Sequence, residues 1–447
     1  MLNKKIKKVI KTSVIASGFV ILPVVSAQAD VIAKGYNPTR TEAVSTTDRN
    51  WKQSNGRWQY FTTDGDYVIN EWKKSGNQWF YLGDEGYMMT DALIEDGDYI
   101  YAVGKDGARL SNTWVYMQNE DGDFSWYYLQ SSGRAKDNGF LTIDGKKYHF
   151  TDGKMDEISV QVGNYTYALN QEHDGSYGAV QDGWIYINDV DAENSDYEEE
   201  GWYYFGTNGK RVEGQEKKIN GHYYAFDEQG LMLDQFVSYT DAEGKTVYKY
   251  YRPGVGDRID GWYWIEAGDQ DDIGMNVEED AWFYFGSNGT MYSADYKTTK
   301  IADNIGVAKI KGEYYAFDEN GAMQTDFIKG SDGQTYYFDL TSGKMKTGRV
   351  NISEDSDSDY ADETFYFNKK GEAITGVENG YLYNGGQLMK AEDYRYEIKT
   401  VADHDYLVNK SGKVQKAGTY RDREQDVQFT VVKNADNTYN ITITDID

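Results

Sequence analysis

Residues 202–209 read W-Y-Y-F-G-T-N-G, and this pattern recurs at four other places along the chain. The other copies are W-F-Y-L-G-D-E-G at 79–86, W-Y-Y-L-Q-S-S-G at 126–133, W-F-Y-F-G-S-N-G at 282–289 and T-F-Y-F-N-K-K-G at 364–371. In every copy a Gly lies seven residues after the first position. Consecutive aromatic residues favour a short strand, and a Gly-bearing turn then reverses the chain. Each copy therefore predicts one arm of a β-hairpin.

A second repeated hairpin follows the later copies and ends on a Met. It reads G-K-K-Y-H-F-T-D-G-K-M from Gly145, G-H-Y-Y-A-F-D-E-Q-G-L-M from Gly221, G-E-Y-Y-A-F-D-E-N-G-A-M from Gly312 and G-Y-L-Y-N-G-G-Q-L-M from Gly380. A third, more variable hairpin leads to the module-closing positions Trp114, Trp184, Trp262, Arg349 and Thr419. An isolated hairpin is only marginally stable, so neighbouring hairpins must stack. The sequence predicts an all-β solenoid of stacked short hairpins over 51–420.

The end of the chain differs from the repeats. Apolar and polar residues alternate on both sides of 434–437, which predicts a longer β-hairpin. A repeat array needs a cap on its open end. We therefore expect residues 421–447 to form a carboxyl-terminal capping hairpin.

The composition supports a folded chain and restricts its partners. The 447 residues include 41 Tyr and 11 Trp, whereas disordered chains are poor in aromatic rings. Asp and Glu number 74 against 46 Lys and Arg, giving a formal net charge of −28. This charge repels phosphate backbones, so nucleic acid is not expected as a partner. The absence of Cys excludes disulfides, a thiol nucleophile and Cys-ligated metal.

The first residues have the pattern of an export signal. A Lys-rich start precedes an apolar run over 14–25, and Ala27-Gln28-Ala29 fits a cleavage site. We expect residues 1–29 to be a signal peptide and residues 30–50 a polar leader. The run is short for a bilayer span, and no later stretch is apolar enough to be one. The predicted location is therefore secreted and attached non-covalently to a cell wall or cell surface, with no membrane span after signal removal.

The repeats resemble a known family. Their pattern is similar to the choline-binding and glucan-binding type of bacterial cell-wall-binding repeat. It consists of a Trp, a short gap, G-x-W-Y-Y/F, a turn with Gly and a later Met. G-K-K-Y-H-F at 145–150 also resembles the repetitive domains of large clostridial toxins, which are related. The resemblance covers roughly residues 51–420. It implies a superhelix of hairpins that binds teichoic acid choline, or glucan and other surface sugars, in crevices between consecutive hairpins.

The resemblance also implies the ligand-binding residues. Family sites take a Trp and a Tyr from the W-Y-Y strand, the Trp that opens the next repeat, and often a Met. Near the amino terminus the matching sets are Trp58 and Tyr60 with Trp72, and Trp79 and Tyr81 with Met88. Further along, the matching strand residues are Trp126, Tyr128, Trp202, Tyr204, Trp282 and Tyr284, and the matching opening rings are Trp114, Trp184 and Trp262. All 11 Trp lie at or before position 282, so the last third departs from the family pattern.

Two ligand chemistries and a structural role remain open for these rings. A quaternary ammonium donates no conventional hydrogen bond, so it is recognised by the negative faces of several rings. Sugars stack their C–H faces on the same kinds of ring and need polar groups beside them. Alternatively, a given Tyr or Met packs one hairpin on the next and binds nothing.

The remaining motifs do not point to catalysis. Acidic loops over 119–125, 189–200, 268–280 and 353–363 are a solubilising rim or, at Asp189, Asp191, Glu193 and Glu200, a weak calcium loop. The four His show no metal-ligand spacing, and no nucleophile or phosphate-loop motif is present. We expect no enzyme activity, no cofactor and no bound metal. The alternatives are a host-glycan-binding adhesin or toxin-like module, and a non-catalytic partner or degenerate form of a cell-wall lytic enzyme.

Overall fold

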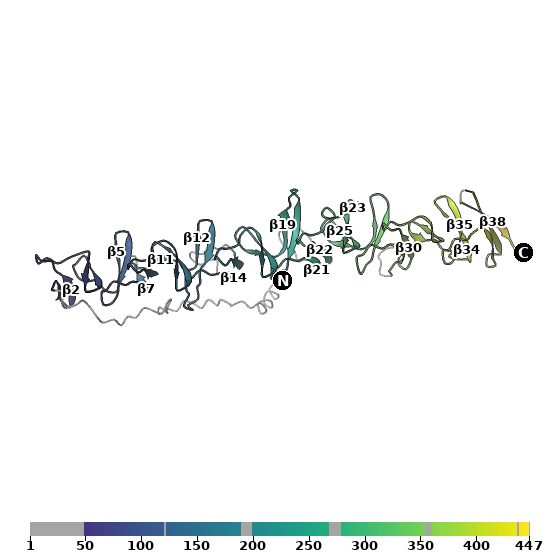
Figure 1. Ribbon diagram of the computed structural model, residues 1–447. Helices are drawn as coiled ribbons and strands as arrows, with labels where there is room; N and C mark the ends of the chain where they lie inside the picture. The colour runs from purple at the N-terminus through teal and green to yellow at the C-terminus, as the bar shows by residue number, and fades with distance from the viewer. Residues whose placement is uncertain are drawn as a thin grey trace. The chain divides into compact units, whose positions relative to one another are not determined.

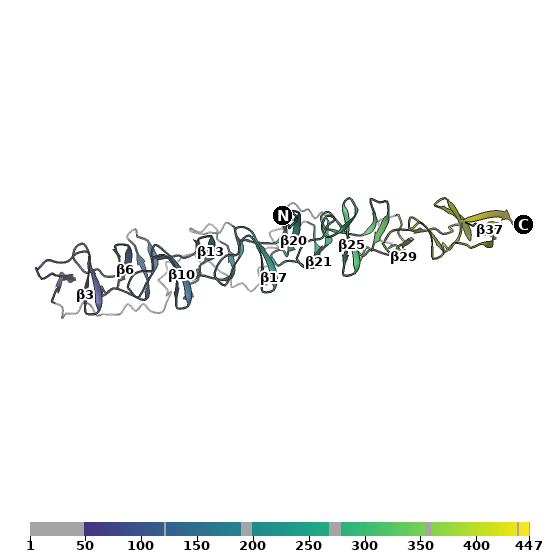
Figure 2. The ribbon, with the colours of Figure 1, turned by 45° about the horizontal axis from the view of Figure 1, so that its top comes forward.

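The computed structural model describes residues 49–119, 122–188, 199–267, 279–353, 359–435 and 438–446. All regular elements in these ranges are strands, labelled β1 to β38. The chain divides into two compact units: unit 1 comprises residues 1–219 and 224–232, and unit 2 comprises residues 220–223 and 233–447. Within each unit, successive hairpins follow one another in chain order (Figures 1 and 2). The described part of each unit is therefore an all-β array of the kind that the repeats predict.

Unit 1 contains antiparallel hairpins built from short strands. They are β1 (Trp51–Ser54) with β2 (Arg57–Tyr60), β3 (Glu71–Ser75) with β4 (Gln78–Leu82), β5 (Ala92–Asp96) with β6 (Tyr99–Val103), β7 (Thr113–Gln118) with β8 (Phe124–Leu129), β9 (Gly139–Ile143) with β10 (Lys146–Thr151) and β11 (Lys154–Met155), β12 (Ser159–Val162) with β13 (Tyr165–Ala168), and β14 (Gly183–Ile187) with β15 (Gly201–Phe205). The next strands are β16 (Glu216–Ile219), β17 (His222–Phe226) and β18 (Met232–Leu233). β16 belongs to unit 1, whereas β17 and β18 contain residues assigned to both units.

Unit 2 continues the same arrangement with some larger sheets. Its strands are β19 (Gln235–Thr240) with β20 (Thr246–Tyr251), β21 (Gly261–Ile265) with β22 (Ala281–Phe285), β23 (Thr299–Ala302) with β24 (Ile305–Ile310), β25 (Glu313–Asp318) and β26 (Met323–Gln324), β27 (Asp326–Lys329) with β28 (Thr335–Phe338), β29 (Gly348–Asn351) with β30 (Thr364–Phe367), β31 (Gly376–Glu378), β32 (Tyr381–Asn384) and β33 (Gln387–Leu388), β34 (Tyr396–Val401) with β35 (His404–Asn409), and β36 (Gly418–Asp422) with β37 (Val427–Lys433) and β38 (Tyr439–Asp445).

Each internal hairpin buries side chains on both of its faces, as β7 and β8 illustrate. Tyr127 and Leu129 on one face pack with Ala102 of the preceding hairpin. Trp114 on the other face packs with Tyr148 of the following hairpin. Side chains alternate between the faces of a strand, so consecutive rings in W-Y-Y serve two different neighbours. The core is thus a series of small aromatic clusters between hairpins.

One position links each hairpin to its neighbours. The residue two places after a turn Gly donates its backbone N–H to a strand carbonyl of the preceding hairpin: Met88 to Trp58, Arg109 to Trp79, Val180 to Lys147, Arg211 to Thr166 and Arg258 to Tyr223, at 2.7 to 2.9 Å. Its side chain lies against the turn Gly of the following hairpin. We call these residues the linking residues. Gly209, for example, has φ of 79° and faces Val180, so the turn tolerates no Cβ there.

The two ends of the chain relate differently to the described residues. The expected signal peptide and nearly all of the polar leader lie outside the described ranges. In the expected capping segment β37 pairs antiparallel with β38, and β36 adds a third strand to the sheet. Asp422 of β36 is fully buried and accepts a hydrogen bond from the backbone N–H of Tyr396. No helix within the described ranges has the length and apolar character needed to cross a membrane.

Candidate aromatic binding sites

Four hairpins place a Trp directly across from a Tyr. The registered pairs are Trp72 with Tyr81, Trp114 with Tyr128, Trp184 with Tyr204, and Trp262 with Tyr284. In all four the ring centroids lie 5.1 or 5.2 Å apart, and the planes are inclined by 60 to 64°. Trp51 and Tyr60 form a fifth pair at 5.3 Å. The repeat thus reproduces one ring geometry because it reproduces one strand register.

The following hairpin completes three of these pairs with a Tyr, a Phe and a Met. Trp114 lies 4.9 Å from Tyr148, Trp184 lies 4.8 Å from Tyr224, and Trp262 lies 4.8 Å from Tyr315, between ring centroids. The Phe and Met members are Phe150 with Met155, Phe226 with Met232, and Phe317 with Met323. We name these groups the Trp114 cluster, the Trp184 cluster and the Trp262 cluster. The Trp72 cluster comprises Trp72, Tyr81, Met89 and Tyr101, with Trp79 beside them.

The Trp that begins each W-Y-Y strand lies towards the outer edge of its cluster. Trp202 is 6.4 Å from Trp184 and nearly perpendicular to it, and Trp126 has the same relation to Trp114. Trp79 and Trp282 are 37% and 42% exposed. An exposed ring beside a partly buried one offers two faces to a ligand that enters from solvent.

The clusters differ in how open they are. In the Trp114 cluster Trp114, Tyr148 and Met155 are buried at 5%, 2% and 4% exposure, and Tyr177 also packs on the group. In the Trp184 cluster Trp184, Trp202, Tyr204, Tyr224 and Met232 are all partly exposed. The Trp262 cluster is intermediate, because Trp262, Tyr284 and Met323 are partly exposed and Tyr315 is buried. The Trp184 cluster is therefore the most accessible of the three.

Carboxylates lie beside several rings. Tyr186 packs on Trp202 at 5.2 Å, and its hydroxyl donates to Glu200 Oε1 at 2.6 Å. Burial and this hydrogen bond raise the pKa of Tyr186 to about 12. Trp72 Nε1 donates to Asp96 Oδ2 at 3.1 Å. Burial, and then Asp144, raise the pKa values of Tyr128 and Tyr148. The Tyr side chains are thus uncharged phenols near acidic groups, a setting that favours a cation.

The two amino-terminal sets are grouped differently from the sequence-based prediction. Trp58 and Tyr60 pack with Trp51, and not in the cluster of Trp72. Met88 joins that same group with Phe80, whereas Tyr81 packs with Trp72 and Met89. Phe80 and Tyr81 are adjacent and point to opposite faces, so they enter different clusters. The packing groups therefore differ from the predicted sets that joined Trp58 and Tyr60 to Trp72, and Tyr81 to Met88.

The last third of the chain carries an Arg where earlier modules carry the opening Trp. Arg349 is registered with Tyr366, as Trp262 is with Tyr284. Its guanidinium lies 4.6 Å from the Tyr381 ring, and Tyr366 contacts Tyr383 at 5.4 Å. At the next such position Thr419 pairs with Thr430. These two positions lack the ring that the other clusters use.

Sequence reasoning missed the Tyr that the second hairpin contributes. Tyr148, Tyr224 and Tyr315 each lie three residues after the Gly that begins the hairpin motif. The recurrence of this spacing in Y-H-F and Y-A-F was the available signal.

Metal binding has no support among the described residues. They contain no group of three or more His, Cys, Asp or Glu placed to hold an ion. Asp189, Asp191 and Glu193 of the expected calcium loop lie outside the described ranges, and so does much of the other acidic loops. His149 Nδ1 lies 2.6 Å from Asp156 Oδ2, and His173 stacks on Tyr177. These His contacts hold local turns together.

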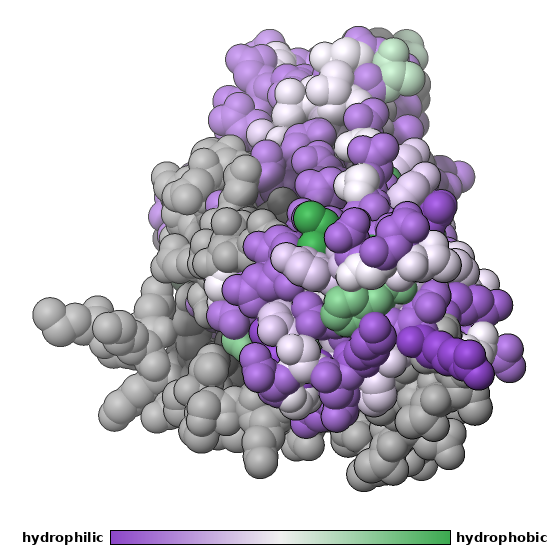
Figure 3. Space-filling view, turned by 90° about the vertical axis from the view of Figure 1, so that its left-hand side faces the viewer, coloured by the Kyte–Doolittle hydropathy of each residue, from purple (hydrophilic) through white to green (hydrophobic). Residues whose placement is uncertain are grey.

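The coloured part of the face drawn in Figure 3 is mainly hydrophilic. On the face drawn in Figure 3 the hydrophobic residues form small separate spots among polar ones. Trp and Tyr fall near the middle of the hydropathy scale, so the aromatic clusters do not stand out as hydrophobic patches. A site made of these rings is compatible with a strongly hydrophilic surface.

Parts of the chain match models of known repeats, and other proteins are similar to it. A choline-binding repeat model matches residues 305–349, and a cell wall binding repeat model matches 70–88, 138–155 and 277–291. Glucosyltransferase-S of Streptococcus mutans is 29% identical over 254 residues, which are 54% of this chain and 15% of that protein. Among solved structures, the choline-binding domain of CbpL from Streptococcus pneumoniae is 24% identical, with 44% of this chain and 94% of that one covered and a TM-score of 0.30. CbpJ of the same species is 19% identical, with 76% and 99% covered and a TM-score of 0.36. The chain spans about a seventh of the length of the glucosyltransferase.

Proposed function

Because the repeats of this chain belong to the choline-binding family of cell-wall-binding repeats, we infer that the protein attaches to choline-bearing cell-wall polymers. We infer that its aromatic clusters make this attachment. Cell-wall, choline or polysaccharide binding is the activity common to these repeats. The finer proposal is that the ligand group is the quaternary ammonium of choline and that the Trp184 and Trp262 clusters are its principal sites.

The observation that carries this proposal is the Trp184 cluster. The rings of Tyr204 and Tyr224, from two hairpins, each lie within 5.1 Å of the Trp184 ring, and all three residues are partly exposed. A trimethylammonium group gains roughly 0.5 to 2 kcal/mol from each ring face that it contacts. Met232 supplies a polarisable wall that needs no hydrogen bond from the ligand. The chemistry of the group suits a cation without N–H donors.

The charge of the surroundings supports the same ligand. Tyr186 packs on Trp202 at the edge of the cluster and donates a hydrogen bond to Glu200, which places a carboxylate there. The whole chain carries a formal charge of −28. A negative surface raises the local concentration of cations and speeds their arrival. The same charge disfavours the phosphate groups of a teichoic acid, so the ammonium must supply the attraction.

Polysaccharide binding is the second candidate, and the exposed Trp residues favour it. Trp264 and Trp282 are each 42% exposed and lie 5.6 Å apart. Flat exposed rings of this kind are suited to stacking on the C–H faces of sugars. The similarity to a protein named glucosyltransferase suggests glucan as the sugar to test. A host glycan would use the same rings.

We propose further that the chain acts by binding and not by catalysis, and that it works outside the cell, attached to the wall. The export signal read from residues 1–29 supports that location. The strands of the described residues form repeated hairpins and the terminal sheet, and aromatic clusters lie between the hairpins. A role as the non-catalytic partner of a lytic enzyme fits the same properties.

Tryptophan fluorescence of the protein, titrated with choline chloride and separately with soluble glucan fragments, tests the proposal. We expect a saturable change with choline that Trp184→Ala weakens at least tenfold at that site, because the variant loses the central ring. Phe124→Ala, which removes a 54% exposed ring outside the cluster, is the matched control and should bind normally. A response to glucan alone would replace choline with polysaccharide. No response to either ligand would contradict the proposal.

A further inference from the structure

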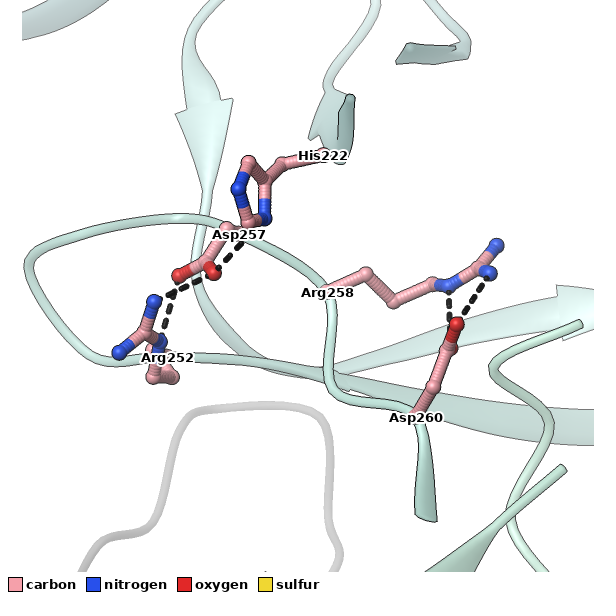
Figure 4. Close-up of polar contacts among 5 residues, drawn as sticks. All are labelled: His222, Arg252, Asp257, Arg258 and Asp260. Atoms are coloured by element: carbon pink, nitrogen blue, oxygen red, sulfur yellow. Dashed lines mark hydrogen bonds and ion pairs between the residues drawn. The ribbon is translucent and has the colours of Figure 1, made fainter. Parts of the chain in front are cut away.

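Three linking residues are Arg, and they differ in what their guanidinium groups contact. Arg211 Nε donates to Glu213 Oε1 at 2.7 Å. Arg258 Nε and Nη2 donate to Asp260 at 3.0 and 3.2 Å (Figure 4). In both cases the acid lies two residues after the Arg. At the third position, Arg109, the residue two places on is Ser111, which carries no charge.

Arg211 and Arg258 also lie over a Tyr ring each, but the guanidinium of Arg109 lies among three rings and beside no acid of this kind. Its central carbon is 5.8 Å from the ring centroid of Trp72, 5.9 Å from that of Trp79 and 5.8 Å from that of Tyr101. These distances are within the range in which a cation is attracted to a ring face. Within the described parts of the chain, Arg109 forms no ion pair with a carboxylate. Its charge is therefore compensated mainly by three rings from strands β3, β4 and β6.

The backbone and the stem of Arg109 fix this position. Its N–H donates to the carbonyl of Trp79 at 2.8 Å. Its stem lies so close to Gly133 that a Cβ on that residue would be 2.6 Å from Nε and 2.9 Å from Cδ. The side chain is thus held over the Trp72 cluster, and is not a free surface group that happens to approach it.

The central Trp rings of the other three named clusters differ from Trp72 in this respect. In the described residues no Lys or Arg lies over the ring of Trp114, Trp184 or Trp262. The Trp72 cluster has the same Trp–Tyr pair as these, at the same 5.1 Å separation. What distinguishes it is that a cation of the protein already lies over its rings.

We propose that Arg109 is a built-in cation that fills the Trp72 cluster and excludes quaternary ammonium ligands from it. This deepens the proposed function, since it determines which of the aromatic clusters take choline. A free ammonium would have to displace a guanidinium that is fixed by its backbone and stem, and the two positive charges would repel each other. Arg109 is thus a specificity-determining residue. Its positive charge keeps quaternary ammonium ligands out of the Trp72 cluster, although the Trp–Tyr pair of that cluster matches those of the proposed binding clusters.

Equilibrium dialysis with labelled choline, counting molecules bound per chain, tests this inference. Arg109→Met suits the position, because Met88 and Met291 are linking residues in other hairpins. We expect Arg109→Met to bind one more choline per chain than the unaltered protein, and Trp72→Ala in the same chain to remove the additional site. Arg109→Lys, which keeps the charge, should add none. Arg258→Met, which removes an acid-paired Arg at the same position, is the matched control and should also add none.

The outcomes separate this inference from the proposed function. An additional site in Arg109→Met supports the inference, even if the unaltered protein binds no choline and the proposed function therefore fails. An unchanged number of sites in Arg109→Met, with a far-ultraviolet circular dichroism spectrum like that of the parent, overturns the inference while leaving choline binding elsewhere intact. An additional site in Arg109→Lys would overturn it too, because charge would then not be the cause.

Discussion

At the scale of single residues, the candidate sites depend on aromatic rings that stay uncharged, because burial and hydrogen bonds keep the Tyr hydroxyls protonated. Tyr186 lies on the edge of the Trp184 cluster, against Trp202, and hydrogen-bonds to Glu200. Burial and the carboxylate both disfavour the phenolate. The pKa of Tyr186 is therefore raised to about 12, and the hydroxyl stays protonated far into the alkaline range.

Tyr186→Phe tests this assignment. Because the folded pKa is raised above the usual value of about 10, the stabilising effect of Tyr186 is complete below pH 10 and is lost as the pH rises through 12. We expect the variant to be about 1 kcal/mol less stable at pH 8, through loss of the partly exposed hydrogen bond, and the difference to shrink above pH 10. The difference in absorbance at 295 nm between the two proteins should titrate near pH 12. A difference that titrates near pH 10 would show that Glu200 does not hold this proton.

At the scale of the element, the hairpin is defined as much by its linking residue as by its strands. The linking residue donates its N–H to the hairpin before it and covers the turn Gly of the hairpin after it. This double contact explains why the Gly recurs at a fixed place in W-Y-Y-F-G-T-N-G. It also explains why the linking position accepts Met, Val and Arg, since only its backbone and its contact with Gly are required.

Gly209→Ala measures the strength of this contact. Gly209 has φ of 79°, and its Cβ would collide with Val180 Cγ1. Gly56 has φ of 78° and open space around it, so Gly56→Ala reports the backbone strain alone. We expect Gly56→Ala to cost about 1 to 2 kcal/mol and Gly209→Ala about 1 to 3 kcal/mol more, in urea unfolding. Equal losses in the two variants would mean that Val180 moves aside freely.

The repeat pattern predicts the elements well and their partners less well. Ring spacing and turn Gly were sufficient to predict stacked hairpins and the antiparallel pairing of β37 with β38. They were not sufficient to assign Met88 or Trp72 to the right neighbours, because membership of a cluster depends on strand register and on which face a side chain takes. Tyr224 and Arg109 were missed for a related reason. Their role comes from contacts across hairpins, which no single repeat contains.

At the scale of the whole molecule, we expect several weak sites on one chain to act together. The Trp184 cluster belongs to unit 1 and the Trp262 cluster to unit 2. Once one site holds a polymer, the second meets its ligand as a group already nearby, so overall affinity exceeds that of either site. A wall polymer with many choline groups suits such a chain better than free choline does.

Trp184→Ala and Trp262→Ala, alone and combined, test this cooperation. We expect each single variant to lose roughly tenfold or more in affinity for a choline-coated surface, while the remaining site binds free choline as before. The double variant should lose nearly all retention. Surface plasmon resonance compared with dialysis of free choline gives both quantities. Single variants that hold the surface as well as the parent would contradict a multivalent attachment.

The most direct test of the central claim is a crystal structure of the protein grown with choline. The account predicts electron density for a trimethylammonium group against the rings of Trp184, Tyr204 and Tyr224, a corresponding group at Trp262, and none at Trp72, where Arg109 lies. Density confined to other surfaces, or well-ordered clusters without a ligand at saturating choline, would contradict it and leave these rings as packing between hairpins.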